Sequence, residues 1–153
     1  MYQLTGEYEC KMDAKGRVKL PTGLIRQLGA DAPASFVINR GFEKHLMLYP
    51  REVWEKKTSE VNQLNLYIPK QRQFVRYFYR GATHITADGA DRILLPRGLA
   101  EYANLGKEIV LLAYHEQIEI WSREHYDAML ENEPEQFSEL AAEVFGGLAA
   151  GED

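Results

Sequence analysis

An aspartate and an arginine four positions apart occur twice in this chain, and these residues are the best suited to chemistry. The segment DAKGRVKLPTGL begins at Asp13 and DGADRILLPRGL begins at Asp88, and six of their twelve aligned positions are identical. An aspartate carboxylate accepts backbone N–H bonds in a tight turn, and a nearby arginine can lie back over it. We therefore expect two equivalent turns, with structural roles for Asp13, Gly16 and Asp88, in which the glycine allows a positive φ.

The first copy of the phrase is the more basic. Residues 11–26 hold one acid, Asp13, against five cations, which are Lys11, Lys15, Arg17, Lys19 and Arg26. Strand alternation places Arg17 and Lys19 on one face. Such a cationic edge suits phosphates, and a guanidinium can also bridge guanine O6 and N7. The composition fits two alternatives, nucleic-acid binding and a solvated basic face.

The second copy is less basic. Ala90 replaces Lys15 and Asp91 replaces Gly16, so that Arg92 and Arg97 stand against two acids. Two alternatives remain for this copy: it is mainly scaffold, or it contacts a nucleic acid less strongly through Arg92.

Signals of an enzyme or a metal site are poor. The four histidines (His45, His84, His115 and His125) are scattered without metal-ligand spacing. The sequence has no GxxxxGK phosphate loop and no nucleophile motif. We expect no catalytic residue, no metal and no cofactor.

Composition bounds the class of protein. A chain of 153 residues can bury a real core, and its one cysteine, Cys10, fits a reducing cytoplasm. The first residues lack the pattern of a signal peptide, and no apolar run approaches the ~20 residues of a membrane span. The sequence therefore predicts a cytoplasmic protein with no membrane partner.

The net charge of −5 hides an asymmetry between the body and the tail. Residues 1–115 carry 17 Lys and Arg against 12 Asp and Glu, whereas residues 116–153 carry one Arg against 11 acids. Local patches rather than the total decide binding, so the acidic whole does not exclude a nucleic-acid partner.

The elements around each Asp–Arg pair repeat as well. Each copy predicts a strand, a tight turn, a second strand, a short helix that opens at Pro21 or Pro96, and then a hairpin. The hairpin strands are the apolar runs FVI (36–38), LMLY (46–49), IVLLA (109–113) and IEIW (118–121). One unit of about 45 residues is too small for its own core, so the two units are expected to complete one shared barrel.

Helices are expected between the units and after them. In the linker, apolar residues recur at helical spacing at Val53, Trp54, Val61, Leu64 and Tyr67. A second helix starts at Pro69, ends at Gly81 and carries a stripe of Arg72, Arg76 and Arg80. The stripe fits a solvated face, a phosphate contact or an ion pair with the acidic tail. In the tail, Ser122 suits a helix cap and Pro134 suits the start of a further helix.

The doubled phrase resembles the MraZ family of bacterial transcription regulators. The resemblance rests on MDAKGRVKLP, LYPREVWEK, FVRYFYRGA and DGADRILLP followed by IEIW, and it extends to about Tyr126. It implies an α+β fold in which two AbrB-like repeats share a swapped-hairpin β-barrel flanked by helices. The implied divisions are a first repeat at 5–51, a helical linker at 52–80, a second repeat at 81–124 and an acidic helical tail at 125–153.

The resemblance also implies a function. Such a protein forms a ring-like homo-oligomer, binds short G-rich direct repeats in duplex DNA, and represses its own division and cell-wall operon at the nucleoid. The resemblance implies Lys15, Arg17 and Arg92 as DNA contacts, and the basic cluster of the first copy adds Lys11 and Lys19 as candidate contacts. The sequence departs from the family pattern at Asp91, where a glycine is common, and this difference argues against an equal role for the second turn. The alternative from another class is an assembly scaffold without specific DNA binding.

Overall fold

The computed structural model describes residues 2–29, 35–131 and 136–151, which form two compact units. The first unit is Met1–Arg123 and the second is Glu124–Asp153. The four-part division of the chain that the sequence suggests stays a prediction.

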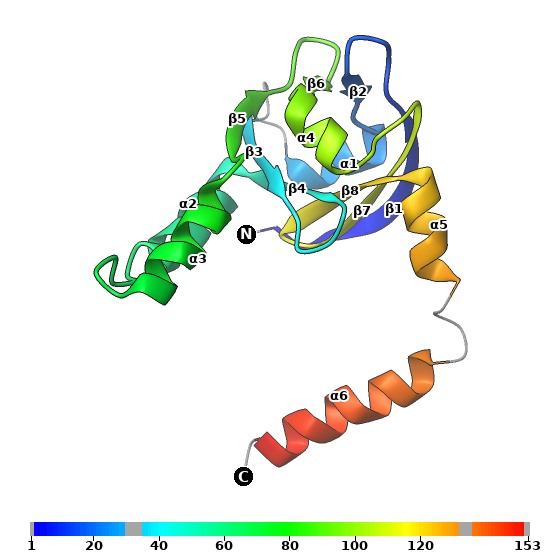
Figure 1. The fold of residues 1–153 in the computed structure, drawn as a ribbon. Helices are drawn as coiled ribbons and strands as arrows, with labels where there is room; N and C mark the ends of the chain where they lie inside the picture. The colour runs from blue at the N-terminus through cyan, green and yellow to red at the C-terminus, as the bar shows by residue number, and fades with distance from the viewer. Residues whose placement is uncertain (1, 30–34, 132–135, 152–153) are drawn as a thin grey trace. The chain divides into compact units, whose positions relative to one another are not determined.

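The first unit contains the two repeated sets of elements in the expected order (Figure 1). The first set is β1 (Leu4–Lys11), β2 (Arg17–Lys19), α1 (Thr22–Leu28), β3 (Ser35–Arg40) and β4 (Leu46–Pro50). The second set is β5 (Thr83–Thr86), β6 (Arg92–Leu94), α4 (Arg97–Tyr102), β7 (Glu108–His115) and β8 (Gln117–Ser122). Pro21 and Pro96 lie immediately before α1 and α4 with extended backbone, because the proline ring fixes φ and leaves the carbonyl free to accept the first helical bonds.

The two repeats interlock through their strands. The main sheet has the order β1-β7-β8-β4-β3-β5, and the pairs β1–β7 and β3–β5 are antiparallel. The first strand of each repeat therefore pairs with the hairpin of the other repeat, and β4–β8 joins the two hairpins at the centre. Among the described residues β1 and β5 are the two free ends of this sheet. The α+β class is thus confirmed, whereas closure into a barrel is not.

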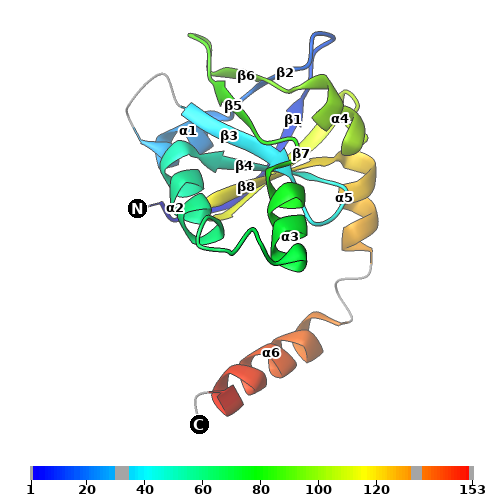
Figure 2. The ribbon, with the colours of Figure 1, turned by 60° about the vertical axis from the view of Figure 1, so that its left-hand side comes forward.

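A two-stranded ribbon of β2 and β6 covers the core at one end of the sheet. Val18 lies opposite Ile93 in this ribbon, and both side chains are buried. Equivalent leucines of the two repeats join the same hydrophobic cluster, namely Leu20 with Leu95 and Leu24 with Leu99. The turns that precede β2 and β6 project from the same end of the unit in both ribbon views (Figures 1 and 2).

Two helices, α2 (Arg51–Val61) and α3 (Pro69–Tyr79), form an arm at the side of the sheet (Figure 2). The ring of Phe78 stacks on Trp54 with centroids 5.2 Å apart, and the side chain of Asn39 donates to the Phe78 carbonyl at 2.6 Å. Gly81 follows α3 with a positive φ of 92°. The prediction that the helical pattern extends to Leu64 and Tyr67 was wrong. Helix α2 ends at Val61, and the chain forms turns until α3 begins at Pro69.

The second unit consists of helices. It contains α5 (Arg123–Leu130) apart from its first residue, and α6 (Phe137–Gly151). The expected helix start at Pro134 lies outside the described residues. In the part of the chain that the structure describes, no helix is long and apolar enough to cross a membrane.

Candidate nucleic-acid interface

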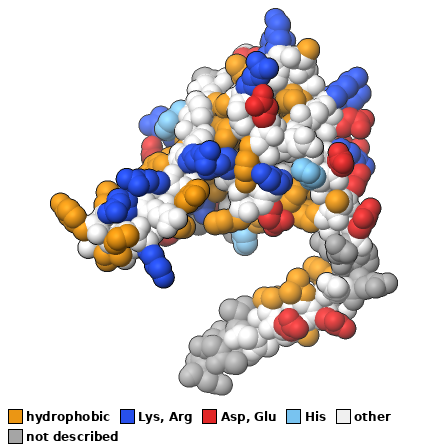
Figure 3. Space-filling model, viewed as in Figure 1, with side chains coloured by type: hydrophobic (Ala, Val, Ile, Leu, Met, Phe, Trp, Pro, Cys, Tyr) orange, Lys and Arg blue, Asp and Glu red, His pale blue; other side chains and the backbone are white. Residues whose placement is uncertain are grey.

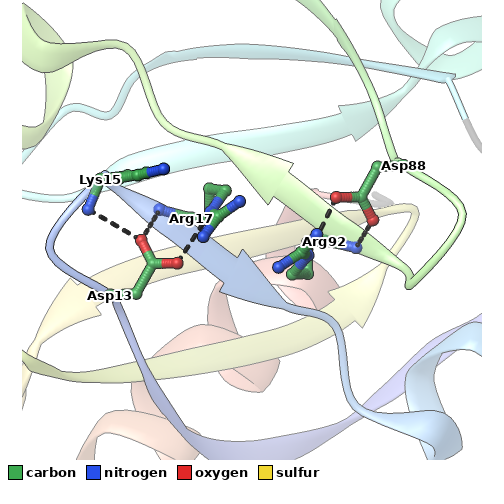
Figure 4. Close-up of polar contacts among 5 residues, drawn as sticks. All are labelled: Asp13, Lys15, Arg17, Asp88 and Arg92. Atoms are coloured by element: carbon green, nitrogen blue, oxygen red, sulfur yellow. Dashed lines mark hydrogen bonds and ion pairs between the residues drawn. The ribbon is translucent and has the colours of Figure 1, made fainter.

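The first Asp–Arg turn is held by a single carboxylate. One oxygen of Asp13 accepts the backbone N–H groups of Lys15 and Arg17, each at 2.9 Å. Its other oxygen accepts Nε of Arg17 at 2.8 Å (Figure 4). The expected structural turn with an ion pair is therefore present.

The second turn has the same geometry. One oxygen of Asp88 accepts the N–H groups of Ala90 at 2.9 Å and Arg92 at 3.0 Å. The other accepts Nε of Arg92 at 2.9 Å. The loss of Lys15 and Gly16 in this copy has left the bonding of the turn unchanged.

These bonds lower the pKa of both aspartates below the ordinary value of 3.8. The largest cause is the backbone N–H bond from the arginine, at Arg17 for Asp13 and at Arg92 for Asp88. Hydrogen bonds to the ionised form favour that form. Both carboxylates are therefore charged at neutral pH and hold their arginines.

The ion pair fixes each guanidinium by one edge. Asp13 engages Nε of Arg17, and the described residues offer the two terminal Nη nitrogens no hydrogen-bond partner. The side chains of Arg17 and Arg92 are 32% and 39% exposed. A guanidinium that is held in place loses less freedom when its remaining donors form a forked contact. Both arginines are thus prepared to contact an outside acceptor.

The two turns also hold each other. Gly16 and Asp91 both have positive φ, at 84° and 59°. The Gly16 carbonyl accepts the N–H of Leu95, and the Asp91 carbonyl accepts the N–H of Leu20, both at 2.9 Å. Aspartate is one of the few residues with a side chain that visit this conformation. The difference at position 91 therefore changes the charge of the turn and not its backbone.

Strand register places two of the predicted cations side by side. Lys19 lies opposite Arg92 across β2 and β6. Because Val18 and Ile93 are buried, their neighbours in the ribbon point outward. Lys19 and Arg92 thus lie side by side on the outer face, whereas Lys11 is exposed in the main sheet, opposite Glu108 of β7.

The outer face contains one residue that the sequence interpretation missed. Leu94 lies opposite Arg17 in the ribbon and is 57% exposed. Leu94 occupies the place in the second repeat that Lys19 occupies in the first. Its position next to the buried Ile93, with strict alternation, was the signal that could have revealed it. The remaining predicted cation, Lys15, is exposed in the first turn.

Arg97 is directed to another partner. Its Nε lies 3.3 Å from Glu101 one helical turn further along α4. Arg97 thus has an ion-pair partner on its own helix and is highly exposed.

A second polar cluster lies inside the sheet and differs in character. His45 stacks on Trp121 with centroids 4.5 Å apart, and its Nε2 lies 3.7 Å from Glu119. Glu119 also accepts hydrogen bonds from Tyr114 and from the indole of Trp121. Burial is the largest cause that raises the pKa of Tyr114, to about 12. Because this cluster is largely enclosed, it serves packing between β4, β7 and β8.

The described residues contain no group of three or more His, Cys, Asp or Glu side chains that could hold a metal ion. Among the candidate site residues, Lys11, Asp13, Lys15, Lys19 and Asp88 are exposed to solvent.

Fold and site together define an α+β protein in which two interlocked repeats present a doubled Asp–Arg turn. The model of the family described as "MraZ protein, putative antitoxin-like" matches the chain twice, at residues 3–77 and 78–147. The chain belongs to the MraZ family.

Several relatives match over nearly the whole chain. A protein of Christiangramia forsetii named "Transcriptional regulator MraZ" is 40% identical over 95% of this chain and 95% of its own length. Proteins of the same name from Flavobacterium psychrophilum and Halothermothrix orenii are each 36% identical, over 97% and 90% of this chain and 95% and 93% of their own lengths.

Proposed function

We propose that the protein is a DNA-binding transcriptional regulator that contacts duplex DNA with the outer face of the β2–β6 ribbon and its two turns. The observation that carries the proposal is the pair of guanidinium groups, Arg17 and Arg92, each held by one edge with its terminal donors open. The names of the relatives support the same class of function.

The chemistry suits G-rich duplex DNA. The two terminal nitrogens of Arg17 form a fork that can donate to O6 and N7 of guanine in the major groove. A two-stranded ribbon fits this groove. Lys11, Lys15 and Lys19 can contact phosphates, which add affinity without sequence preference. Arg92 supplies a second fork in a turn that also holds the negative charge of Asp91.

Affinity then comes from repetition. A few phosphate contacts per subunit give weak binding at physiological salt. A ring-like homo-oligomer presents several ribbons to successive direct repeats, and linked contacts gain about 10²–10⁴ in avidity. We propose that such repeats lie upstream of the protein's own division and cell-wall operon, and that occupied repeats repress it. The protein then acts in the cytoplasm at the nucleoid and needs neither a cofactor nor a catalytic site.

The fold proposal completes this account. We infer that the interleaved sheet is a form of the swapped-hairpin barrel, with both AbrB-like halves in one chain. The exchange of β1 and β5 between the repeats and the paired β2–β6 ribbon support this inference.

The test compares Arg17→Ala with Arg51→Ala on DNA from upstream of the protein's own gene and on scrambled DNA, at two salt concentrations. Arg51 is the matched control because it also forms an ion pair with an acid four residues away, on α2. Each lost guanine contact costs about 1–3 kcal/mol. We expect Arg17→Ala to lose the preference for the upstream DNA and Arg51→Ala to keep it.

Three results would contradict the proposal. Normal preference in Arg17→Ala would remove the ribbon from the recognition surface. Equal binding of wild type to upstream and scrambled DNA, or binding that does not respond to salt, would favour the assembly scaffold instead.

A further inference from the structure

Helix α3 has a shallow pocket on its surface that is lined by basic and aromatic side chains. Gln73, Arg76, Tyr77 and Arg80 line a hollow of about 310 Å³. None of the residues of α3 is fully buried, and Tyr77 is 61% exposed. In Figure 3, Lys and Arg side chains follow the arm that α2 and α3 form. This hollow belongs to neither Asp–Arg turn.

The three arginines of the predicted stripe have different surroundings, since Arg76 and Arg80 line the hollow and Arg72 does not. Arg72 donates to the carbonyl of Leu66 at 3.0 Å and so closes the turn before α3. Among the described residues, the guanidinium groups of Arg76 and Arg80 have no ion-pair partner. Two adjacent cations beside exposed aromatic rings are complementary to a ligand that carries both acidic and apolar groups.

Helix α6 has that chemistry. Phe137, Leu140 and Val144 are between 51% and 64% exposed and follow one side of the helix. Glu139 and Glu143 lie on the adjoining side, four residues apart like Arg76 and Arg80. Figure 3 shows the acidic and hydrophobic side chains of this helix in separate strips. The described side chains of α6 include none that is buried.

The order of the strips fixes the direction of a contact between such helices. Successive residues are rotated by 100° around the helix axis. When α3 and α6 are each viewed from the N-terminus, the apolar strip lies next to the charged strip in the same direction of rotation. Two helices with the same order bring charge to charge only when they run antiparallel. Glu143 then meets Arg76, Glu139 meets Arg80, and Leu140 meets Tyr77.

We propose that α6 of one copy of this chain docks antiparallel into the α3 hollow of a second copy. Each copy has one hollow and one α6, so the contact is head-to-tail and closes into a ring where the rotation allows. The inference deepens the proposed function, because it rests on the ring and assigns the surface that links its subunits.

The test reverses the charges of either side. The variants are R76E/R80E and E139R/E143R, with R51E/K56E on α2 as the control of equal charge change. Assembly mass is measured by sedimentation across a dilution series. Each reversal replaces two attractions with two repulsions, so we expect half-assembly to need at least about tenfold more protein. The control should assemble like wild type.

Mixing separates a contact between copies from one within a copy. Equal amounts of R76E/R80E and E139R/E143R again offer a basic partner to every acidic surface. We expect the mixture to recover the wild-type mass, which a contact inside one chain cannot do. Variants that assemble like wild type, or a mixture that stays dissociated, would overturn the docking. A wild type that is monomeric throughout would overturn the ring itself, whereas DNA preference is measured separately.

Discussion

In the proposed function, the Asp–Arg pairs decide where the molecule contacts DNA. One oxygen of Asp13 accepts backbone N–H bonds of its turn, and the other accepts the bond from Arg17. The same carboxylate thus builds the turn and aims the guanidinium, which explains why the two residue types are kept four apart in both repeats. Replacing either aspartate would therefore disturb turn and arginine together.

The negative charge of Asp91 should weaken the proposed DNA contact of the second turn. Asp91→Asn removes this charge and retains a residue that tolerates positive φ. We expect the affinity for operator DNA to rise about 2- to 10-fold at low salt and less at high salt, because screening weakens the repulsion that is lost. DNA titrations at two salt concentrations measure this change. Glu60→Gln on α2 is the control, and an equal gain there would show a general effect of net charge.

Acid should weaken the fold through His45. Burial is the largest cause that lowers the pKa of His45 below its ordinary 6.5, while the charges of Glu119 and Glu43 act in the opposite direction. The unfolded chain takes up a proton near pH 6.5 and the folded chain only at lower pH. The free energy of unfolding therefore falls as pH drops below 6.5, by up to about 1.4 kcal/mol per pH unit.

Urea unfolding of wild type and His45→Gln between pH 7.5 and 5.5 measures this effect. We expect a smaller pH dependence in His45→Gln. His84→Gln serves as the control because His84 is exposed. A wild-type dependence that persists in His45→Gln would place the responsible group elsewhere.

At the scale of elements, the two helices of the arm are attached differently. Helix α2 buries Val53 and Trp54 against the sheet, whereas α3 has no buried residue. Helix α3 is held by the stack of Phe78 on Trp54 and by the bond from Asn39 to the Phe78 carbonyl. Because the rest of its surface is largely exposed, α3 can open locally while α2 and the sheet stay folded.

Phe78→Ala tests this attachment. Loss of the stacked ring should lower the free energy of local opening of α3 by about 1–3 kcal/mol. Native-state hydrogen exchange should show faster exchange in Pro69–Tyr79 and unchanged exchange in β7 and β8. Lys70→Ala on the same helix should leave both unchanged, and a uniform loss of protection would instead mean that the arm is part of the core.

The sequence predicted these elements to different degrees. Both hairpins and both turns were correctly predicted, because alternation, proline and turn residues act locally. The predicted end of α2 was wrong, because apolar residues continue at helical spacing to Leu64 and Tyr67 beyond the last helical residue. The position of Lys19 beside Arg92 was not predictable, since it depends on pairing between strands far apart in the chain.

At the scale of the whole molecule, neither repeat is a folding unit. Leu4 of β1 lies opposite His115 of β7, and Ser35 of β3 lies opposite Thr86 of β5. Each repeat lacks a neighbour for its sheet until the other has formed. Such long-range pairing makes folding slow and cooperative.

Leu20→Ala and Leu95→Ala test this interdependence, because the two leucines are equivalent, buried and in different repeats. Each should lower the free energy of unfolding by about 2–5 kcal/mol. Urea unfolding at one fixed protein concentration, followed by tryptophan fluorescence and circular dichroism, should show one shared transition in both variants. Separate transitions for the two signals would indicate repeats that fold independently.

The unequal pair of Lys19 and Leu94 has a consequence for orientation. In a symmetric dimer of identical chains, equivalent positions on the two sides of the axis carry the same residue. Here both halves of the ribbon belong to one chain, and its equivalent positions carry different residues, Lys19 and Leu94. The two halves of the ribbon are therefore not equivalent, so in the proposed complex a subunit would have a defined orientation along the double helix. Direct repeats would give every subunit the same orientation, whereas a palindrome would reverse every second one.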